Sequence, residues 1–156
     1  MNTLKTFAVV FALLTASGAP ASAQQFNQFV GYWSGSGTIT VKDGTRERLR
    51  CRGEFAGAAN ALNLMLRCAS DSYKFELQSD IKGDGSNISG SWNELTRHVY
   101  GSISGRVTGN RIEASAVAAG FTAAISLTAR GNTQQVLIRA PGSEISEVAI
   151  SLSRSR

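Results

Sequence analysis

The chain has very few of the residues from which most catalytic and metal sites are built. Its 156 residues include one His and two Cys, which do not supply a metal-ligand set of the usual composition. The G-x-S-x-G motif of serine hydrolases, the glycine patterns of nucleotide-binding loops and the H-E-x-x-H motif of zinc enzymes are all absent. We therefore expect no metal, no cofactor and no enzymatic activity.

The single His, His98, lies close in sequence to Glu94 and Tyr100, between two expected strands. A general acid or base needs a shaped cleft and a shifted pKa. One His in a turn indicates neither, so we expect His98 to be a solvated turn residue.

Long apolar runs are missing, apart from one short run near the start of the chain. Lys5 is followed by an apolar core at residues 7–15 and by Ala21-Ser22-Ala23, a small-residue cleavage site. About nine strongly apolar residues cannot cross a hydrocarbon core that needs roughly 20. We expect residues 1–23 to be a signal peptide and residues 24–156 to form one domain, periplasmic or secreted and not an integral membrane protein.

From residue 24 onward, short runs alternate apolar and polar side chains and are separated by turns rich in Gly, Asn and Asp. This period of two is typical of strands with one buried face. The other face carries mainly Ser, Thr and Arg, which excludes the apolar outer band of a membrane barrel. We predict an all-β domain: an antiparallel up-and-down meander of about 8–10 strands, forming a closed or nearly closed barrel. A two-sheet sandwich is the alternative.

The two cysteines test whether neighbouring strands pair as hairpins. If residues 57–61 are the turn of a hairpin, Cys51 lies opposite Cys68 and Gly53 lies opposite Leu66. The register that pairs the cysteines also places both apolar faces on one side. We expect a Cys51–Cys68 disulfide, as is usual in an exported chain.

The preceding hairpin is expected to turn at residues 42–44. A turn there places Trp33 opposite Phe55 and Ile39 opposite Leu49. All four residues then belong to the buried face.

Two short motifs resemble those of known barrels. Gly31-Tyr32-Trp33 is similar to the G-x-W signature of lipocalins, and Gly90-Ser91-Trp92 is similar to the Trp-bearing strands of avidin-type barrels. The chain thus resembles calycin-like barrels of the lipocalin, avidin or fatty-acid-binding type, and looks like a small exported bacterial barrel. It lacks the T-D-Y motif and C-terminal helix of lipocalins and the helical lid of fatty-acid-binding proteins. The resemblance implies a structural Arg on the closing strand, and Arg154 is the matching residue, expected to stack on Trp33.

A row of arginines occupies the polar face of one expected strand. It comprises Arg46, Arg48, Arg50 and Arg52. This row is either a solvated strand face or a surface that binds an anionic envelope component or an acidic protein. Nucleic acid is not an expected partner, because no aromatic residues alternate with the arginines.

The interior is the other candidate site. Five aromatic residues are predicted to point inward among many Gly and Ala: Trp33, Phe55, Tyr73, Phe75 and Trp92. Small inward residues either leave a cavity or let the barrel close tightly. We expect a binding protein that holds a small apolar or amphipathic molecule; the alternative is an envelope interaction or inhibitor-like module acting through its outer surface.

Overall fold

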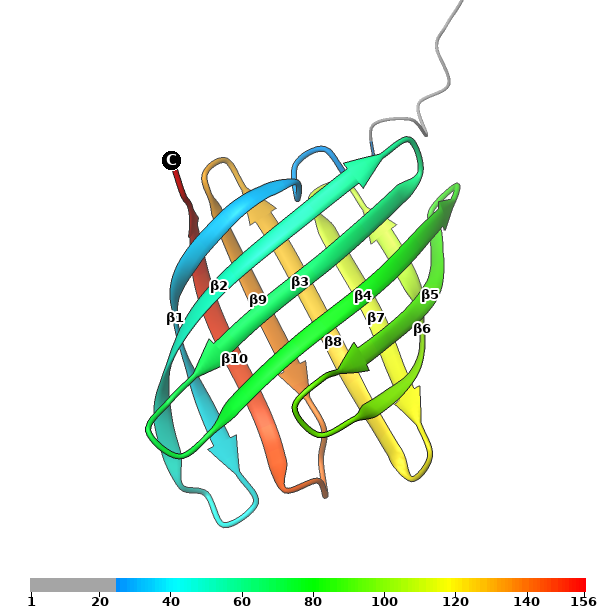
Figure 1. Ribbon diagram of the computed structural model, residues 1–156. Coiled ribbons are helices and arrows are strands. Elements are labelled where there is room, and N and C mark those ends of the chain that lie inside the picture. Colours follow the sequence, from blue (N-terminus) through cyan, green and yellow to red (C-terminus); the bar gives the residue numbers. More distant parts are fainter. Residues whose placement is uncertain (1–24) are drawn as a thin grey trace, which may run out of the picture.

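The computed structural model describes residues 25–156, which form ten antiparallel strands (Figure 1). The expected signal peptide lies outside the described residues. The strands are β1 Gly31–Val41, β2 Arg46–Ala58, β3 Ala61–Ala69, β4 Lys74–Asp84, β5 Asn87–Glu94, β6 Val99–Thr108, β7 Arg111–Ala118, β8 Phe121–Arg130, β9 Thr133–Arg139 and β10 Ile145–Arg154. None of the residues described forms a helix with the length and apolar character needed to cross a membrane.

The sheet is a closed barrel, in which each strand pairs with its sequence neighbour and β1 pairs with β10. The closing pair runs from Trp33 opposite Arg154 to Val41 opposite Ile145. Closure leaves no free strand edge. The prediction of an all-β up-and-down barrel is confirmed, at the upper end of the expected strand number, and the sandwich alternative is wrong.

The disulfide and its hairpin follow the predicted register. Cys51 is bonded to Cys68 across β2 and β3, with 4.2 Å between their Cα atoms. Gly53 pairs with Leu66 and Phe55 with Leu64, all on the inner face. Alternation set the inner face of this hairpin, and the pairing of the two cysteines selected its register.

The first hairpin differs from its prediction by two residues. Trp33 pairs with Gly53, not Phe55, and Ile39 pairs with Glu47. The turn itself lies at residues 42–44 as expected: the amide of Gly44 donates to the carbonyl of Val41, the amide of Val41 donates to the carbonyl of Thr45, and Gly44 has a positive φ of 88°. A turn at these residues is centred on Asp43, whereas the expected pairs were centred one residue further along the chain; a shift of two residues keeps the same side chains on the inner face.

The two ends of the barrel differ. Residues 25–30 fold into a turn at one end, the top of Figure 1, where Phe26 and Phe29 are 2% and 0% exposed. We call this the closed end. The opposite end, at the bottom of Figure 1, carries only the connections between strands and is called the open end.

Candidate ligand-binding site in the barrel interior

The closed end is sealed by side chains that converge on one backbone carbonyl. The carbonyl of Phe29 accepts hydrogen bonds from Nε1 of Trp33 at 3.0 Å and from Nε2 of Gln134 at 2.9 Å. Trp33 and Gln134 are almost completely buried. Two donors on one buried acceptor hold residues 25–30 over this end.

Arg154 completes the seal from β10. Its guanidinium carbon lies 4.3 Å from the centre of the Trp33 ring, and its Nη1 donates to the carbonyl of Val30 at 2.6 Å. The stacking and the hydrogen bond together tie the last strand to the segment before the first. This geometry suits the structural role that the resemblance implied for Arg154.

A cavity of about 330 Å³ enters the barrel from the open end, and we call it the mouth cavity. Its walls are mainly apolar and come from strands on both sides of the barrel. They include Phe75, Leu77, Trp92, Val99, Phe121 and Ile138. The rings of Trp92 and Phe121 lie 5.7 Å apart and tilted by 48°, a favourable aromatic arrangement.

A second cavity of about 100 Å³ lies further inside and is called the deep cavity. Phe55, Ala114 and Ala116 are among its lining residues. Leu77, Trp92 and Ile138 line both cavities, so the two are neighbours separated by shared side chains. The side chains of Ala114 and Ala116 on β7 are too small to fill the deep cavity, and the wall opposite them does not move in to close it.

The structure brings three of the five predicted aromatic residues to these cavities. Phe55 lines the deep cavity, Phe75 the mouth cavity and Trp92 both. Trp33 lines neither, because it lies at the closed end. Tyr73 lines neither, because it precedes β4 in a turn where its amide donates to Oγ of Ser70.

Sequence reasoning did not single out Val99, Phe121 and Ile138 as site residues. Their alternation marks them as inward-facing, but the same signal marks the whole core. What distinguishes them is their height in the barrel: all three lie in the half near the open end. That height depends on how the strands are staggered around the closed sheet.

Charged groups surround the entrance of the mouth cavity. Glu94 is only 7% exposed, and its carboxylate accepts hydrogen bonds from the hydroxyl and amide of Thr96 and from the amides of Glu76 and Arg97. Burial opposes ionisation of Glu94, but these hydrogen bonds outweigh it and lower its pKa below the usual value. Glu94 is therefore ionised at neutral pH, with Nη1 of Arg97 3.6 Å away.

Two more carboxylates lie at this entrance. Glu147 lines the mouth cavity but is paired with Arg139, 3.0 Å from its Nε. Glu144 also lines the cavity and is exposed. With Glu94 and Arg97 included, the entrance carries more negative than positive charge.

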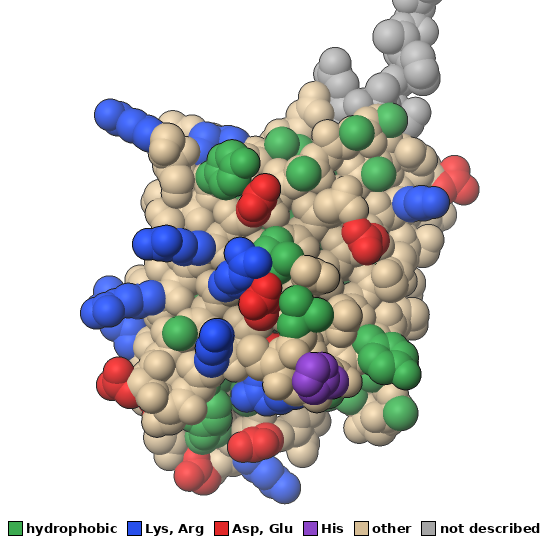
Figure 2. Space-filling view, viewed as in Figure 1, with side chains coloured by type: hydrophobic (Ala, Val, Ile, Leu, Met, Phe, Trp, Pro, Cys, Tyr) green, Lys and Arg blue, Asp and Glu red, His purple; other side chains and the backbone are tan. Residues whose placement is uncertain are grey.

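The other candidate residues lie outside the barrel. Arg46, Arg48, Arg50 and Arg52 are all exposed and lie on the outer face of β2. In Figure 2 Lys and Arg gather on the side where β1 and β2 run. His98 is exposed in the turn between β5 and β6, with a positive φ of 57°.

Comparison with known proteins identifies the architecture. No protein-family model and no curated protein sequence matches the chain. The crystal structure of Rv2717c from M. tuberculosis superimposes with a TM-score of 0.67 at 15% identity, covering 89% of this chain and 100% of that one. The S-type phycobiliprotein lyase CPES from Guillardia theta superimposes with a TM-score of 0.58 at 10% identity, covering 84% and 90%. At these identities the likeness establishes the fold, and the protein is a calycin-like ten-stranded barrel.

Proposed function

We propose that this protein binds a small apolar or amphipathic molecule through the open end of its barrel. The mouth cavity carries the proposal, because it is an apolar space with one polar entrance in a barrel whose other end is sealed. A ligand would place its apolar part against Phe75, Trp92 and Phe121. Burial of that part contributes about 25 cal/mol per Å² of apolar surface removed from water.

The size of the cavity limits the ligand. Pockets for small molecules are roughly 300–1,000 Å³, and the mouth cavity of about 330 Å³ lies at the lower end of that range. Of the described residues, only the shared side chains Leu77, Trp92 and Ile138 are common to its wall and that of the deep cavity. We therefore infer a ligand with one slender apolar chain or a small ring system.

The charges at the entrance restrict the polar end of the ligand. Glu94 lies next to Arg97 and Glu147 is paired with Arg139, so Glu144 is the carboxylate without an ion pair among the described residues of the entrance. A carboxylate at the entrance would meet like charge in a partly desolvated place. The ligand is therefore neutral or cationic at its polar end.

The phycobiliprotein lyase shares the barrel fold. Its name states that it acts on phycobiliproteins, and at 10% identity only its fold is transferred. A lyase with this fold is consistent with our proposal that this barrel binds a small molecule. We propose binding because the wall of the mouth cavity is mainly apolar.

We also propose that the protein acts in the periplasm or outside the cell. The disulfide supports this, because disulfides persist in oxidising compartments. Intact-mass measurement of the protein from its native host would show whether residues 1–23 have been removed.

Titration with N-phenylnaphthylamine, an uncharged fluorescent dye, tests the proposed function. We expect saturable uptake, displacement by decanol and decylamine, and weaker displacement by decanoate. Val99→Trp should block uptake, because residue 99 lines the mouth cavity. Val117→Trp is the matched control: Val117 is 43% exposed on the outside of β7, so the same change there should leave uptake intact.

Two results would overturn the proposal. One is a folded protein with no saturable dye uptake. The other is equal loss of uptake in both variants, which would place the dye on the outer surface.

A further inference from the structure

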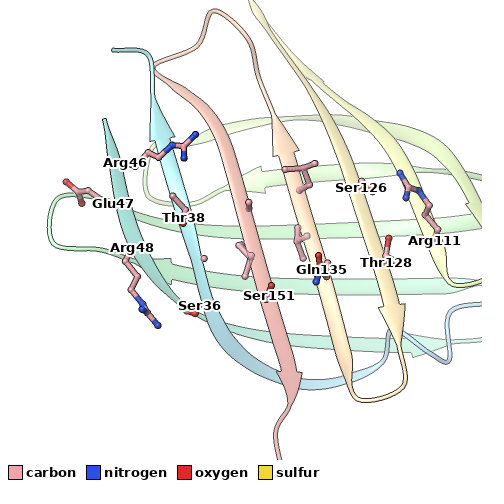
Figure 3. A pocket seen from close by; sticks show the side chains of 15 residues that line it. Ser36, Thr38, Arg46, Glu47, Arg48, Arg111, Ser126, Thr128, Gln135 and Ser151 are labelled. Carbon is pink, nitrogen blue, oxygen red and sulfur yellow. The ribbon is translucent and has the colours of Figure 1, made fainter. Parts of the chain in front are cut away.

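A wide trough crosses the outer face of the barrel, on a different surface from the mouth cavity. It has a volume of about 830 Å³ and is open to solvent. Figure 3 shows Ser36 and Thr38 on β1, Ser151 on β10, Gln135 on β9, and Ser126 and Thr128 on β8 along its floor. The trough therefore crosses the seam where the first and last strands meet.

The floor is low because its residues are short and pair directly across the strands. Ser36 pairs with Ser151, Ser151 with Gln135 and Gln135 with Thr128. The backbone of Gly37 is also part of the floor. The hydroxyls and the amide of these residues thus form one polar row across the strands, beside which Ala149 and Leu137 contribute apolar side chains to the floor.

Arginines rise on both sides of this strip. Arg46 and Arg48 extend from β2 on one side and Arg111 extends from β7 on the other (Figure 3). Adjacent strands are about 4.8 Å apart, so the distance from β2 to β7 along the surface is roughly 24 Å. This length suits an extended chain better than a single small ion.

The arginines on β2 form no ion pairs with the described carboxylates. Arg46 and Arg48 have no carboxylate within ion-pair distance in the part of the chain described, and neither do Arg50 and Arg52. Glu47 lines the trough but accepts hydrogen bonds from Oγ of Ser70 and the amide of Ser72.

The opposite side is partly neutralised. Arg111 donates to the carboxylate of Glu113, with the closest N–O distance at 2.7 Å. On the β2 side Arg46 and Arg48 outnumber Glu47, so this side of the trough carries a net positive charge, and the rest of the lining is partly polar and partly apolar.

We propose that this trough binds a single chain of an anionic glycan. Carboxylate or sulfate groups on the chain would engage Arg46 and Arg48, which present fork-shaped donors for planar and tetrahedral anions. The sugar hydroxyls would hydrogen-bond to the Ser, Thr and Gln side chains of the floor. This proposal is independent of the proposed ligand in the barrel interior.

The floor favours a glycan over a nucleic acid. Proteins that bind single-stranded nucleic acid stack bases on aromatic side chains. None of the described residues lining the trough is aromatic. A flat anionic membrane is a poorer fit as well, since it would contact the arginines without reaching the recessed hydroxyls.

The test measures binding of two anionic glycans, heparin and polygalacturonate. Single-stranded DNA is the control polyanion, because it has few free sugar hydroxyls. At about 50 mM salt we expect both glycans to bind more tightly than DNA, and binding to weaken as salt rises. Arg46→Glu with Arg48→Glu should weaken glycan binding at least about tenfold. Lys74→Glu with Lys82→Glu is the matched control: both residues are exposed on β4, outside the trough, and the change in net charge is the same.

A third variant tests the floor without changing charge. Ser151→Phe at an exposed floor position should obstruct a bound chain and weaken binding at least several-fold. The proposal is overturned if DNA binds as tightly as the glycans, if the β4 variant loses as much affinity as the β2 variant, or if Ser151→Phe binds like the wild type.

Discussion

Removal of the Cys51–Cys68 disulfide should destabilise the barrel by about 3 kcal/mol. The bond closes a loop with a sequence separation of 17 residues. The chain-entropy relation gives a loss of about 10.7 cal/mol/K for a loop of roughly this length, or about 3.2 kcal/mol at 25 °C. For a domain of about 130 residues, this corresponds to a fall in Tm of roughly 10 °C.

The loss should separate into an entropic part and a packing part. Both cysteines are buried, at 3% and 2% exposure, so their side chains also belong to the core. Reduction with a thiol reagent breaks the crosslink but keeps both sulfur atoms in place. Cys51→Ala with Cys68→Ala removes the sulfur atoms as well, and should be less stable than the reduced wild type by about 1 kcal/mol or more.

Chemical unfolding of the oxidised, reduced and double-Ala proteins measures these terms. Because the thiols are buried, reduction must be carried out under unfolding conditions before refolding. A reduced protein within about 1 kcal/mol of the oxidised one would refute the entropic argument. It would mean that β2 and β3 stay paired in the unfolded state, so that the crosslink restricts little.

Three further changes test other parts of the structure. Arg154→Ala should cost about 1 kcal/mol and alter the fluorescence of Trp33, because it removes the stacked guanidinium; unchanged emission would contradict the seal at the closed end. Ala114→Leu should raise stability by about 1 kcal/mol by filling the deep cavity, and a lower Tm would show that the cavity wall cannot accommodate the added carbons. The pKa of Glu94 is lowered in the folded state. Its ionised carboxylate therefore contributes fully to the free energy of unfolding above the ordinary pKa of 4.5, and this contribution is lost as the pH falls through the lowered pKa. Glu94→Gln should therefore be less stable at pH 7 and should lose less stability than the wild type between about pH 5 and pH 3, and parallel acid curves would refute this.

The amino-acid sequence by itself determined the local features of the barrel. Alternation of side chains gave the strands and their inner faces, and the parity of Cys51 and Cys68 gave one hairpin register. These are properties of a strand with a period of two and its immediate neighbour. The row from Arg46 to Arg52 could likewise be placed on an outer face.

The tertiary structure decided where the sites are. Trp33 and Phe55 both point inward, yet Trp33 seals the closed end and only Phe55 reaches a cavity. The difference depends on the turn of residues 25–30, which shows no alternation, and on the stagger of the strands when the sheet closes.

The trough depends on closure in the same way. Its floor joins Ser36 of the first strand to Ser151 of the last, more than a hundred residues apart in sequence. Alternation constrains the face on which each residue lies, because it is local. It carries no information on which distant strand will lie beside that face, since this is fixed only when the hydrogen bonds of β1 and β10 close the barrel.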